Sequence, residues 1–259
     1  MGLIEVMRDA RGVATLWLAR EDKHNALSAD MMTELEAAAH ALAEDTDVRV
    51  VVLAARGKSF CAGADLGWMR AQFGMDAASR RAESARIATA LAALHALPQP
   101  LIGRVQGNAF GGGIGLAAVC DVTLGADHLK MGLTEVRLGI IPANIGPYVV
   151  ARMGAVRAAE VFMNGRIFGA AEAERLGLLS RAVPAEALDD AVEAEVGPYL
   201  SCAPGAVREG KALLRHLSGG VPAAQVEHAI DALSRRWETE EAQAGIQAFF
   251  DKRPAPWVE

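Results

Sequence analysis

Aromatic residues and cysteines are scarce in this sequence of 259 residues. Aromatic side chains make up 5% of the chain, so alanine, valine, leucine and isoleucine must fill the interior. The three cysteines, Cys61, Cys120 and Cys202, are odd in number and lack the spacing of a metal site. Free thiols are typical of a reducing compartment. We therefore expect a cytoplasmic protein that holds no metal ion.

The chain also lacks a run of basic residues and a long apolar segment. Its 26 Lys and Arg residues are outnumbered by 32 Asp and Glu residues, which gives a net charge of −6. Binding to a nucleic-acid backbone normally requires a clustered basic face, so we exclude nucleic acid as the main partner. Glu5 and Arg8 interrupt any secretory signal, and the weakly charged stretch 105–120 contains five glycines. We expect no signal peptide and no membrane contact.

Strand and helix patterns alternate over the first two-thirds of the chain. Segments 4–8 and 13–18 predict a hairpin, and Ser28 is a suitable N-cap for the next helix. That helix carries one apolar stripe, formed by Met31, Met32, Leu35, Ala39 and Leu42. Three apolar runs, 48–54, 101–105 and 122–126, predict strands that are buried on both faces. A second helix, with Ile87, Leu91 and Leu94 on one face, precedes the second of these runs. The alternation predicts an α/β fold.

The last part of the chain is predicted to be helical. The helical pattern begins at about Glu186, and Pro204, Gly219–Gly220 and Pro222 divide it into segments. We therefore predict an α/β core over residues 1–200 and a helical C-terminal region over residues 201–259. This region would pack on the core or on a neighbouring subunit.

Three segments combine glycines and polar residues near the ends of predicted strands. They are 59–66 (SFCAGADL), 107–116 (GNAFGGGIGL) and 131–142 (MGLTEVRLGIIP). Glycines before a helix expose backbone N–H groups at the positive end of the helix dipole. The loop 61–65 offers another N–H from the opposite side, and two such donors on one carbonyl oxygen form an oxyanion hole. Taken singly, each glycine-rich stretch fits close helix–strand packing equally well.

Together these segments resemble the crotonase (enoyl-CoA hydratase/isomerase) superfamily. The resemblance extends over nearly the whole chain, with further markers at 21–27 (EDKHNAL), 176–183 (LGLLSRAV) and 249–253 (FFDKR). It implies a spiral of ββα units with a helical C-terminal region, assembled as a homotrimer or homohexamer. It also implies an acyl-CoA substrate, of which coenzyme A is a part, and no separate cofactor.

The resemblance also assigns roles to individual residues. The amides of the oxyanion hole fall on Ala64 and Gly112, and the catalytic glutamate falls on Glu135. The residues that it implies in binding the substrate or its CoA part are Lys23, Ala26, Ala62, Asp65, Leu66, Gly111, Gly115, Phe249 and Lys252. The alternatives are helix packing for Phe249 and a solvated charge for His24 beside Lys23.

The sequence around Glu135 suits a group that transfers protons. Leu133, Leu138 and Ile140 flank it on both sides. A carboxyl lodged among these side chains has its pKa raised by desolvation, because burial disfavours the charged form. A proton-transferring group requires such a pKa near neutrality.

Gly115 departs from the pattern of the family's hydratases. They usually carry a second glutamate there, so that one carboxylate orients and deprotonates water while the other delivers a proton to Cα. A single-base site is what the family also uses to move a double bond. Hydration then requires that Glu135 serve both roles, with water in the space beside Gly115.

A finer resemblance favours hydration. Segments 8–27, 63–70, 136–150 and 187–190 look like those of bacterial 3-methylglutaconyl-CoA hydratases of leucine degradation. Segment 143–150 (ANIGPYVV) replaces the usual family segment and reshapes the wall near the acyl group. We therefore expect a hydro-lyase that acts on a short branched enoyl-CoA, with 3-methylglutaconyl-CoA preferred. The alternatives are a Δ3,Δ2-enoyl-CoA isomerase and a CoA-ester-binding or RNA-binding protein without turnover.

Five other residues have competing interpretations. Asp65 and Asp121 fit turn or helix-end caps. Arg104 interrupts an apolar strand, either in an ion pair with Asp121 or another acid, or as a ligand for a distal carboxylate of the substrate. Arg70 is a second candidate for that carboxylate. Cys61 lacks a recognisable histidine partner and is predicted to be a small core residue.

Overall fold

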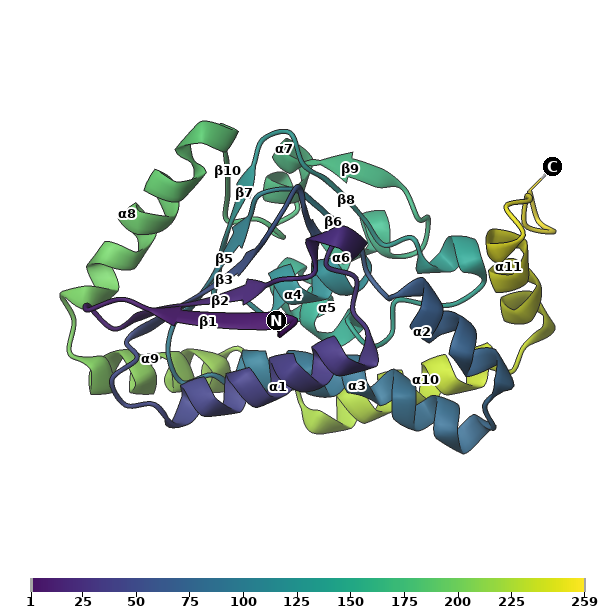
Figure 1. Cartoon of the computed structure of the whole chain (residues 1–259), viewed down its shortest axis with the longest axis horizontal. Coiled ribbons are helices and arrows are strands. Elements are labelled where there is room, and N and C mark those ends of the chain that lie inside the picture. The colour runs from purple at the N-terminus through teal and green to yellow at the C-terminus, as the bar shows by residue number, and fades with distance from the viewer. Residues whose placement is uncertain (1, 259) are drawn as a thin grey trace.

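A computed structural model describes residues 2–258, and two β-sheets form its core (Figure 1). The larger sheet has six strands in the order β1-β2-β3-β5-β7-β10. Its strands are β1 (Ile4–Arg8), β2 (Val13–Leu18), β3 (Val50–Ala55), β5 (Leu101–Val105), β7 (Val122–Ala126) and β10 (Arg181–Val183). β1 and β2 form the predicted antiparallel hairpin, and every other neighbouring pair in this sheet is parallel.

The smaller sheet places the loops of the site side by side. Its order is β4-β6-β8-β9, and its strands are β4 (Ser59–Cys61), β6 (Asn108–Phe110), β8 (Lys130–Gly132) and β9 (Ile167–Gly169). In the pairs β3–β4, β5–β6 and β7–β8, the first strand joins the larger sheet and the second joins the smaller one. Because β4, β6 and β8 are parallel neighbours, their carboxyl ends lie at one edge. The loops that follow these three strands therefore converge.

Eleven α-helices and four short 3-10 helices surround the sheets within residues 2–258. The α-helices are α1 (Ala29–Glu44), α2 (Leu66–Ala71), α3 (Ala77–Ala96), α4 (Gly112–Ala118), α5 (Gly146–Met153), α6 (Ala155–Phe162), α7 (Ala170–Arg175), α8 (Leu188–Leu200), α9 (Pro204–Leu217), α10 (Ala223–Trp237) and α11 (Glu240–Phe250). The 3-10 helices are η1 (Glu21–Lys23), η2 (Gln72–Gly74), η3 (Glu135–Leu138) and η4 (Ala185–Ala187). Ser28 caps α1 as predicted, since its side chain accepts a hydrogen bond from the Met31 N–H. The five apolar residues predicted to form the α1 stripe are all buried.

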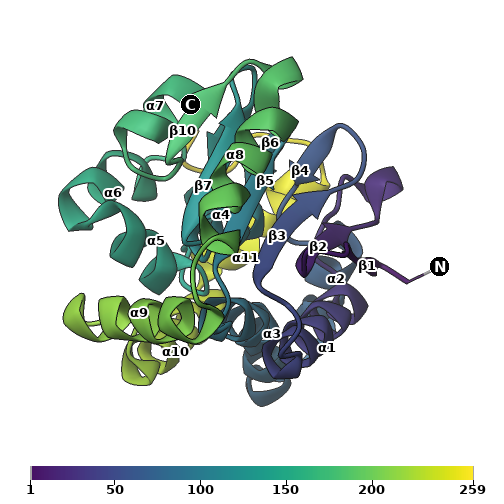
Figure 2. The ribbon, with the colours of Figure 1, turned by 90° about the vertical axis from the view of Figure 1, so that its left-hand side faces the viewer.

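Helices cover both faces of the larger sheet. All six residues of β3 are buried, as expected for a strand enclosed on both sides. On one face, α8 packs Leu188, Val192 and Val196 against strands β2, β3, β5 and β7, and Figure 2 shows this helix lying across the sheet. The other face meets α1, α3 and α4, whose apolar side chains belong to the main core cluster. The fold is therefore α/β, as the sequence predicts.

The C-terminal helices pack beside the core rather than inside it. α10 packs along α3, and the N-terminal end of α11 lies against η3 (Figure 1). The predicted breaks are confirmed, because α9 starts at Pro204 while Gly219–Gly220 and Pro222 separate it from α10. No helix within residues 2–258 combines the length and the apolar character needed to cross a lipid bilayer.

The prediction was most accurate for the larger sheet. The bounds of β1, β2, β5 and β7 are those predicted, and β3 lies one or two residues beyond the predicted run. The smaller sheet was not predicted. Its strands have three residues each, which is too short for an alternating pattern to identify a strand.

Candidate active site

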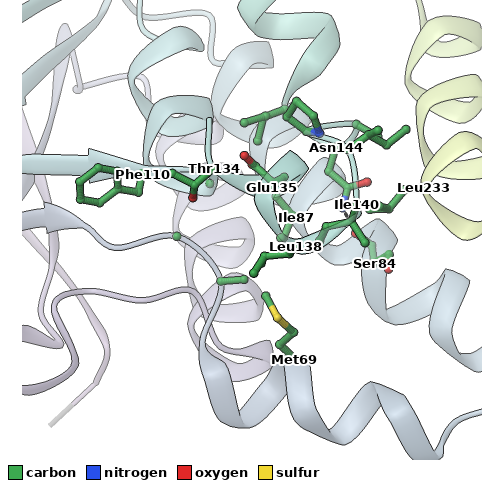
Figure 3. A pocket seen from close by; sticks show the side chains of 18 of the residues that line it. Met69, Ser84, Ile87, Phe110, Thr134, Glu135, Leu138, Ile140, Asn144 and Leu233 are labelled. Atoms are coloured by element: carbon green, nitrogen blue, oxygen red, sulfur yellow. Dashed lines mark hydrogen bonds between the residues drawn. The ribbon is translucent and has the colours of Figure 1, made fainter. Parts of the chain in front are cut away.

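A cavity of about 430 Å³ lies at the ends of β6 and β8. Its walls come from the loop after β4, from α2, α3 and α10, and from the segment before α5. Most of the lining is apolar, including Met69, Ile87, Leu138, Ile140 and Leu233, and Figure 3 shows these side chains around Glu135. A cavity of this size accommodates a short acyl chain and restricts water around any charged group inside.

Two loops carry the candidate oxyanion donors. Leu27 N–H donates to the Gly63 carbonyl at 2.8 Å, and Asp65 N–H donates to the Leu27 carbonyl at 3.0 Å, so Ala64 lies between two fixed residues. Gly63 adopts a φ of +95°, and a Cβ there would stand 3.8 Å from Gly112 N. The turn after β4 and the start of α4 are therefore in contact.

The N–H groups of Ala64 and Gly112 are both available to a ligand. Neither donates a hydrogen bond to another residue within 2–258. Gly112 is the first residue of α4, where helix N–H groups have no partner inside the helix. Two unpaired donors from adjacent loops at the wall of one cavity can stabilise negative charge on a carbonyl oxygen.

Glu135 lies at the start of η3, and its carboxyl group lies against Gly111, the residue before Gly112. Its Oε1 is 3.1 Å from the position that a Cβ on Gly111 would occupy, so the absence of that Cβ lets the carboxyl approach the start of α4. Gly111 also has a φ of +48°, a conformation that other L residues rarely adopt. Glu135 Oε2 is shielded from solvent and has no hydrogen-bond partner within the described residues.

Burial raises the pKa of the Glu135 carboxyl to about 7, while a hydrogen bond from its own N–H opposes the shift. The folded chain therefore holds a proton between about pH 4.5 and 7 that the unfolded chain releases. Because the folded state binds more protons in this window, stability falls as the pH rises through it. A pKa near neutrality lets one carboxyl both accept and return a proton at physiological pH.

The space beside Gly115 is filled, which corrects the sequence-based expectation of a water there. A Cβ on Gly115 would stand 2.5 Å from Ile145 Cγ2 and 3.0 Å from Leu91 Cδ1. Gly115 does not line the cavity, whereas Ile145, which packs against it, does. The glycine therefore serves the packing of α4 against α3 and the segment before α5.

The residues implied in binding the substrate or CoA fall into two groups. Ala62, Leu66, Gly111 and Phe249 line the cavity. The others lie outside its wall: Lys23, Ala26, Asp65, Gly115 and Lys252. The segment with Lys23 is nevertheless joined to the loop after β4, since Ala62 N–H donates to the His24 carbonyl at 3.0 Å.

Asp65 and Asp121 have structural contacts. Asp65 caps α2 by accepting from the Trp68 N–H at 2.9 Å and forms a salt bridge with Arg20 at 2.9 Å. Asp121 accepts from the Leu101 N–H at 2.7 Å and pairs with Lys211 at 2.5 Å. The prediction of caps is confirmed for Asp65. Asp121 instead ties strand β5 to helix α9.

Arg104 and Arg70, the candidates for binding a distal carboxylate, contact other residues outside the cavity. Arg104 pairs with Asp189 at 2.6 Å, rather than with Asp121. Arg70 lies over the Phe250 ring, with its Cζ 4.4 Å from the ring centroid. Neither arginine lines the cavity. Cys61 is fully buried as predicted, and burial raises the pKa of its thiol to about 12.

Three buried polar residues of the cavity were missed by the sequence analysis, as was the exposed Arg137. Gln72, Ser84 and Asn144 line its wall although all three are buried. Gln72 and Ser84 resemble ordinary polar positions of surface helices, so no periodicity marks them. Asn144 lies in the 143–150 segment that departs from the family pattern. This departure is the only sequence feature that points to Asn144 as a residue of the site. Within residues 2–258, no cluster of three or more His, Cys, Asp or Glu side chains is arranged to hold a metal ion.

The two sheets and the helical C-terminal region form the crotonase fold. An enoyl-CoA hydratase from Mycobacterium smegmatis superposes with a TM-score of 0.81 at 35% identity, covering 99% of both chains. An enoyl-CoA hydratase from Mycobacterium avium superposes with a TM-score of 0.89 at 28% identity, covering 100% of both chains.

The family follows from the sequence match. The sequence model of the protein family described as enoyl-CoA hydratase/isomerase matches residues 8–259. The crotonyl-CoA hydratase of Syntrophomonas wolfei is 31% identical over 256 residues, which is 98% of this chain and 97% of that protein. The chain belongs to the enoyl-CoA hydratase/isomerase family of enzymes.

Glu135→Gln is expected to lower kcat by about 10²–10⁴-fold, because the amide keeps the shape of the side chain but neither accepts nor returns a proton. Binding of a saturated acyl-CoA should persist, since the N–H groups of Ala64 and Gly112 are untouched. Steady-state kinetics and calorimetric titration of the variant measure the two quantities. A variant that retains more than about a tenth of the wild-type kcat would show that another group moves the proton.

Gly115→Glu is expected to lose stability without gaining a second catalytic acid, because Ile145 and Leu91 occupy the space that the new side chain needs. Overpacking of this kind typically costs about 1–3 kcal/mol. The double variant Gly115→Glu/Ile145→Ala should recover part of the melting temperature. If the single variant hydrates crotonyl-CoA faster than wild type at unchanged stability, the packing account of Gly115 is wrong.

Proposed function

We propose that this enzyme adds water across the Cα=Cβ bond of a 2-enoyl-CoA thioester. The observation that carries the proposal is the buried Glu135 carboxyl beside two unpaired backbone N–H groups, those of Ala64 and Gly112. The thioester oxygen lies between the two N–H groups, which stabilise the negative charge of the enolate-like transition state. Coenzyme A enters as part of the substrate.

One carboxyl handles both protons in this mechanism. The Glu135 carboxylate accepts a proton from water as the water oxygen bonds to Cβ, and electron density moves through the Cα=Cβ bond onto the thioester oxygen. The protonated Glu135 then delivers that proton to Cα, and the thioester carbonyl re-forms. Both additions take place on the face that Glu135 occupies, so the addition is syn. A pKa of about 7 supports both steps.

We propose a short branched acyl group, with 3-methylglutaconyl-CoA as the substrate. Support comes from the 143–150 segment, which departs from the family pattern, because its residues Ala143, Asn144 and Ile145 line the cavity. A further support is Arg137, an exposed cationic residue of the cavity lining that has no salt bridge within residues 2–258. A carboxylate on the acyl chain needs such a partner or a set of hydrogen-bond donors.

Isomerisation of a 3-enoyl-CoA to a 2-enoyl-CoA is the second candidate. One observation favours it: apolar atoms of Ile145 and Leu91 fill the space where a second carboxyl would lie. A single carboxyl is sufficient to move a proton from C2 to C4 without added water. The two reactions share the oxyanion donors and differ in whether water reaches Cβ.

A substrate panel decides between these reactions. With 3-methylglutaconyl-CoA, crotonyl-CoA and a 3-enoyl-CoA, we expect hydration of the first two and a higher kcat/KM for the branched substrate. Loss of the enoyl-thioester absorbance and detection of the 3-hydroxyacyl product measure hydration. If the enzyme shifts the 3-enoyl double bond and hydrates neither of the others, isomerisation is its reaction.

We also propose that the enzyme assembles as a homotrimer or homohexamer. The side chains of Leu213, Leu214 and Leu217 on α9 are 57%, 68% and 73% exposed, and this helix buries none of its residues. Apolar faces of this kind usually meet a partner.

Light scattering should give a mass of three or six chains for the wild type. The double variant Leu214→Glu/Leu217→Glu should dissociate, because carboxylates placed at a buried contact cannot be solvated. Val156→Glu is the control, because it makes the same change at a side chain that is 85% exposed on α6 rather than on α9. A wild-type protein of one-chain mass would rule out the assembly.

A further inference from the structure

One wall of the mostly apolar cavity carries a cluster of three buried polar side chains. Gln72 is 1% exposed, Ser84 is 2% exposed and Asn144 is 6% exposed. They come from η2, from α3 and from the segment before α5. Figure 3 shows Ser84 and Asn144 close to Leu233 and Ile140, to one side of Glu135. We call these three residues the polar recess.

The hydrogen bonds within the recess leave one acceptor without a partner. Asn144 Nδ2 donates to the Ser84 carbonyl at 2.8 Å. A carbonyl oxygen can only accept, so the amide cannot be turned around, and Oδ1 is fixed on the side away from that contact. Asn144 Oδ1 is buried and has no hydrogen-bond partner within residues 2–258.

The recess also contains a hydroxyl group that can be redirected. Ser84 Oγ donates to Gln72 Oε1 at 3.3 Å, which is long for an O–H···O hydrogen bond. The hydroxyl can rotate toward a better acceptor in the cavity at little cost. An acceptor on Asn144 and a donor on Ser84 therefore lie in one wall, in a cavity whose other walls are mostly apolar.

The Arg80 guanidinium is not free to bind a ligand in the recess. Arg80 lies behind it, but its Nε donates to the Gln72 carbonyl at 3.0 Å and its NH2 donates to the Met75 carbonyl at 2.6 Å. Its remaining nitrogen pairs with Glu238. An apolar acyl tail would leave Asn144 Oδ1 buried without a partner, an arrangement that folded proteins rarely keep unless a ligand or water uses it.

We infer that the polar recess binds an oxygen-bearing substituent of the acyl chain, beyond Cβ, and so selects the substrate of this enzyme. The inference rests on the proposed function, since it places an acyl-CoA in this cavity. A hydroxyl on the acyl chain donates to Asn144 Oδ1 and accepts from Ser84 Oγ. A carboxylate accepts from Ser84 and makes no bond to Asn144 Oδ1. A hydroxyl and a carboxylate would both place an oxygen atom in the recess, and the binding experiment below distinguishes between them.

Binding of saturated acyl-CoA esters tests the recess without requiring turnover. Calorimetric titration compares pairs of equal chain length in which a terminal methyl replaces a terminal hydroxyl. The pairs are 4-hydroxybutanoyl-CoA with pentanoyl-CoA, 5-hydroxypentanoyl-CoA with hexanoyl-CoA, and 6-hydroxyhexanoyl-CoA with heptanoyl-CoA. For at least one pair, the hydroxyl compound should bind about tenfold more tightly, the value of one well-formed hydrogen bond.

Glutaryl-CoA, with its carboxylate on C5, identifies the source of the oxygen. Tighter binding of glutaryl-CoA than of 5-hydroxypentanoyl-CoA assigns the recess to a carboxylate, and weaker binding assigns it to a hydroxyl. If the 5-hydroxypentanoyl-CoA and hexanoyl-CoA pair is the one that responds, hexanoyl-CoA should bind less tightly than the preferred oxygen-bearing ester. If every hydrocarbon ester binds as tightly as its oxygen-bearing counterparts, the inference is overturned.

Variants of the recess provide the second test. Asn144→Leu, which has nearly the same size, should invert the preference within the responding pair. Ser84→Ala should reduce the preference for the hydroxyl ester by several-fold. This variant tests the recess if Asn144→Leu does not fold. Asn164→Leu is the matched control, because Asn164 makes a similar amide-to-carbonyl bond to Glu160 at 2.8 Å but lies outside the cavity.

The results of the variants separate this inference from the proposed reaction. An unchanged preference in Asn144→Leu and Ser84→Ala, both folded, overturns the recess. Should the substrate panel show no hydration, the proposed reaction fails while the binding preference of the recess stands on its own measurement.

Discussion

The burial of one carboxyl group, that of Glu135, is the constraint on which the rest of the site depends. Its Oε2 has no hydrogen-bond partner in the described chain, and apolar side chains surround it, so the charged form is disfavoured and the pKa rises to about 7. Burying an unpaired carboxyl group is unfavourable, and helices α10 and α11 of the C-terminal region help to fix the turn that carries it. A Cβ on Gly139, at the end of η3, would stand 2.6 Å from the Glu241 carbonyl, so α11 lies directly on the turn that carries Glu135. Arg236 of α10 also donates to the Gly139 carbonyl, at 2.6 Å.

The smaller sheet brings the oxyanion donors to this carboxyl. Its parallel strands β4, β6 and β8 end at one edge, and the three loops that follow carry Ala64, Gly112 and Glu135. Close approach requires glycine at specific positions. Gly63 and Gly111 have positive φ angles, and a side chain on Gly111 would meet the Glu135 carboxyl. The chemistry therefore depends on backbone geometry at least as much as on side chains, which explains why a single titratable residue is enough to define the site.

The larger sheet and the helices could be predicted from the sequence because their signals are local. Ser28 marks a helix start, and the apolar runs of β3, β5 and β7 identify strands enclosed on both faces. The roles of Ala64, Gly112 and Glu135 came from a family resemblance rather than from local pattern. Two features depend on tertiary packing and could not be predicted. Ile145, distant along the chain, fills the space beside Gly115. Ser84 is buried on α3, on which α10 packs, and its carbonyl accepts a hydrogen bond from Asn144 of the segment before α5.

The central claim is that Glu135 titrates near neutral pH because it is buried without a partner. Carbon-13 NMR of protein labelled at the glutamate carboxyl carbon tests it directly, with the Glu135 resonance assigned by its absence from Glu135→Gln. The account predicts a titration midpoint near pH 7, with the carboxyl protonated below and charged above it. Binding of a saturated acyl-CoA, which excludes more water, should move the midpoint upward. A midpoint near the ordinary glutamate value of about 4.3, with or without the ester, would contradict the account.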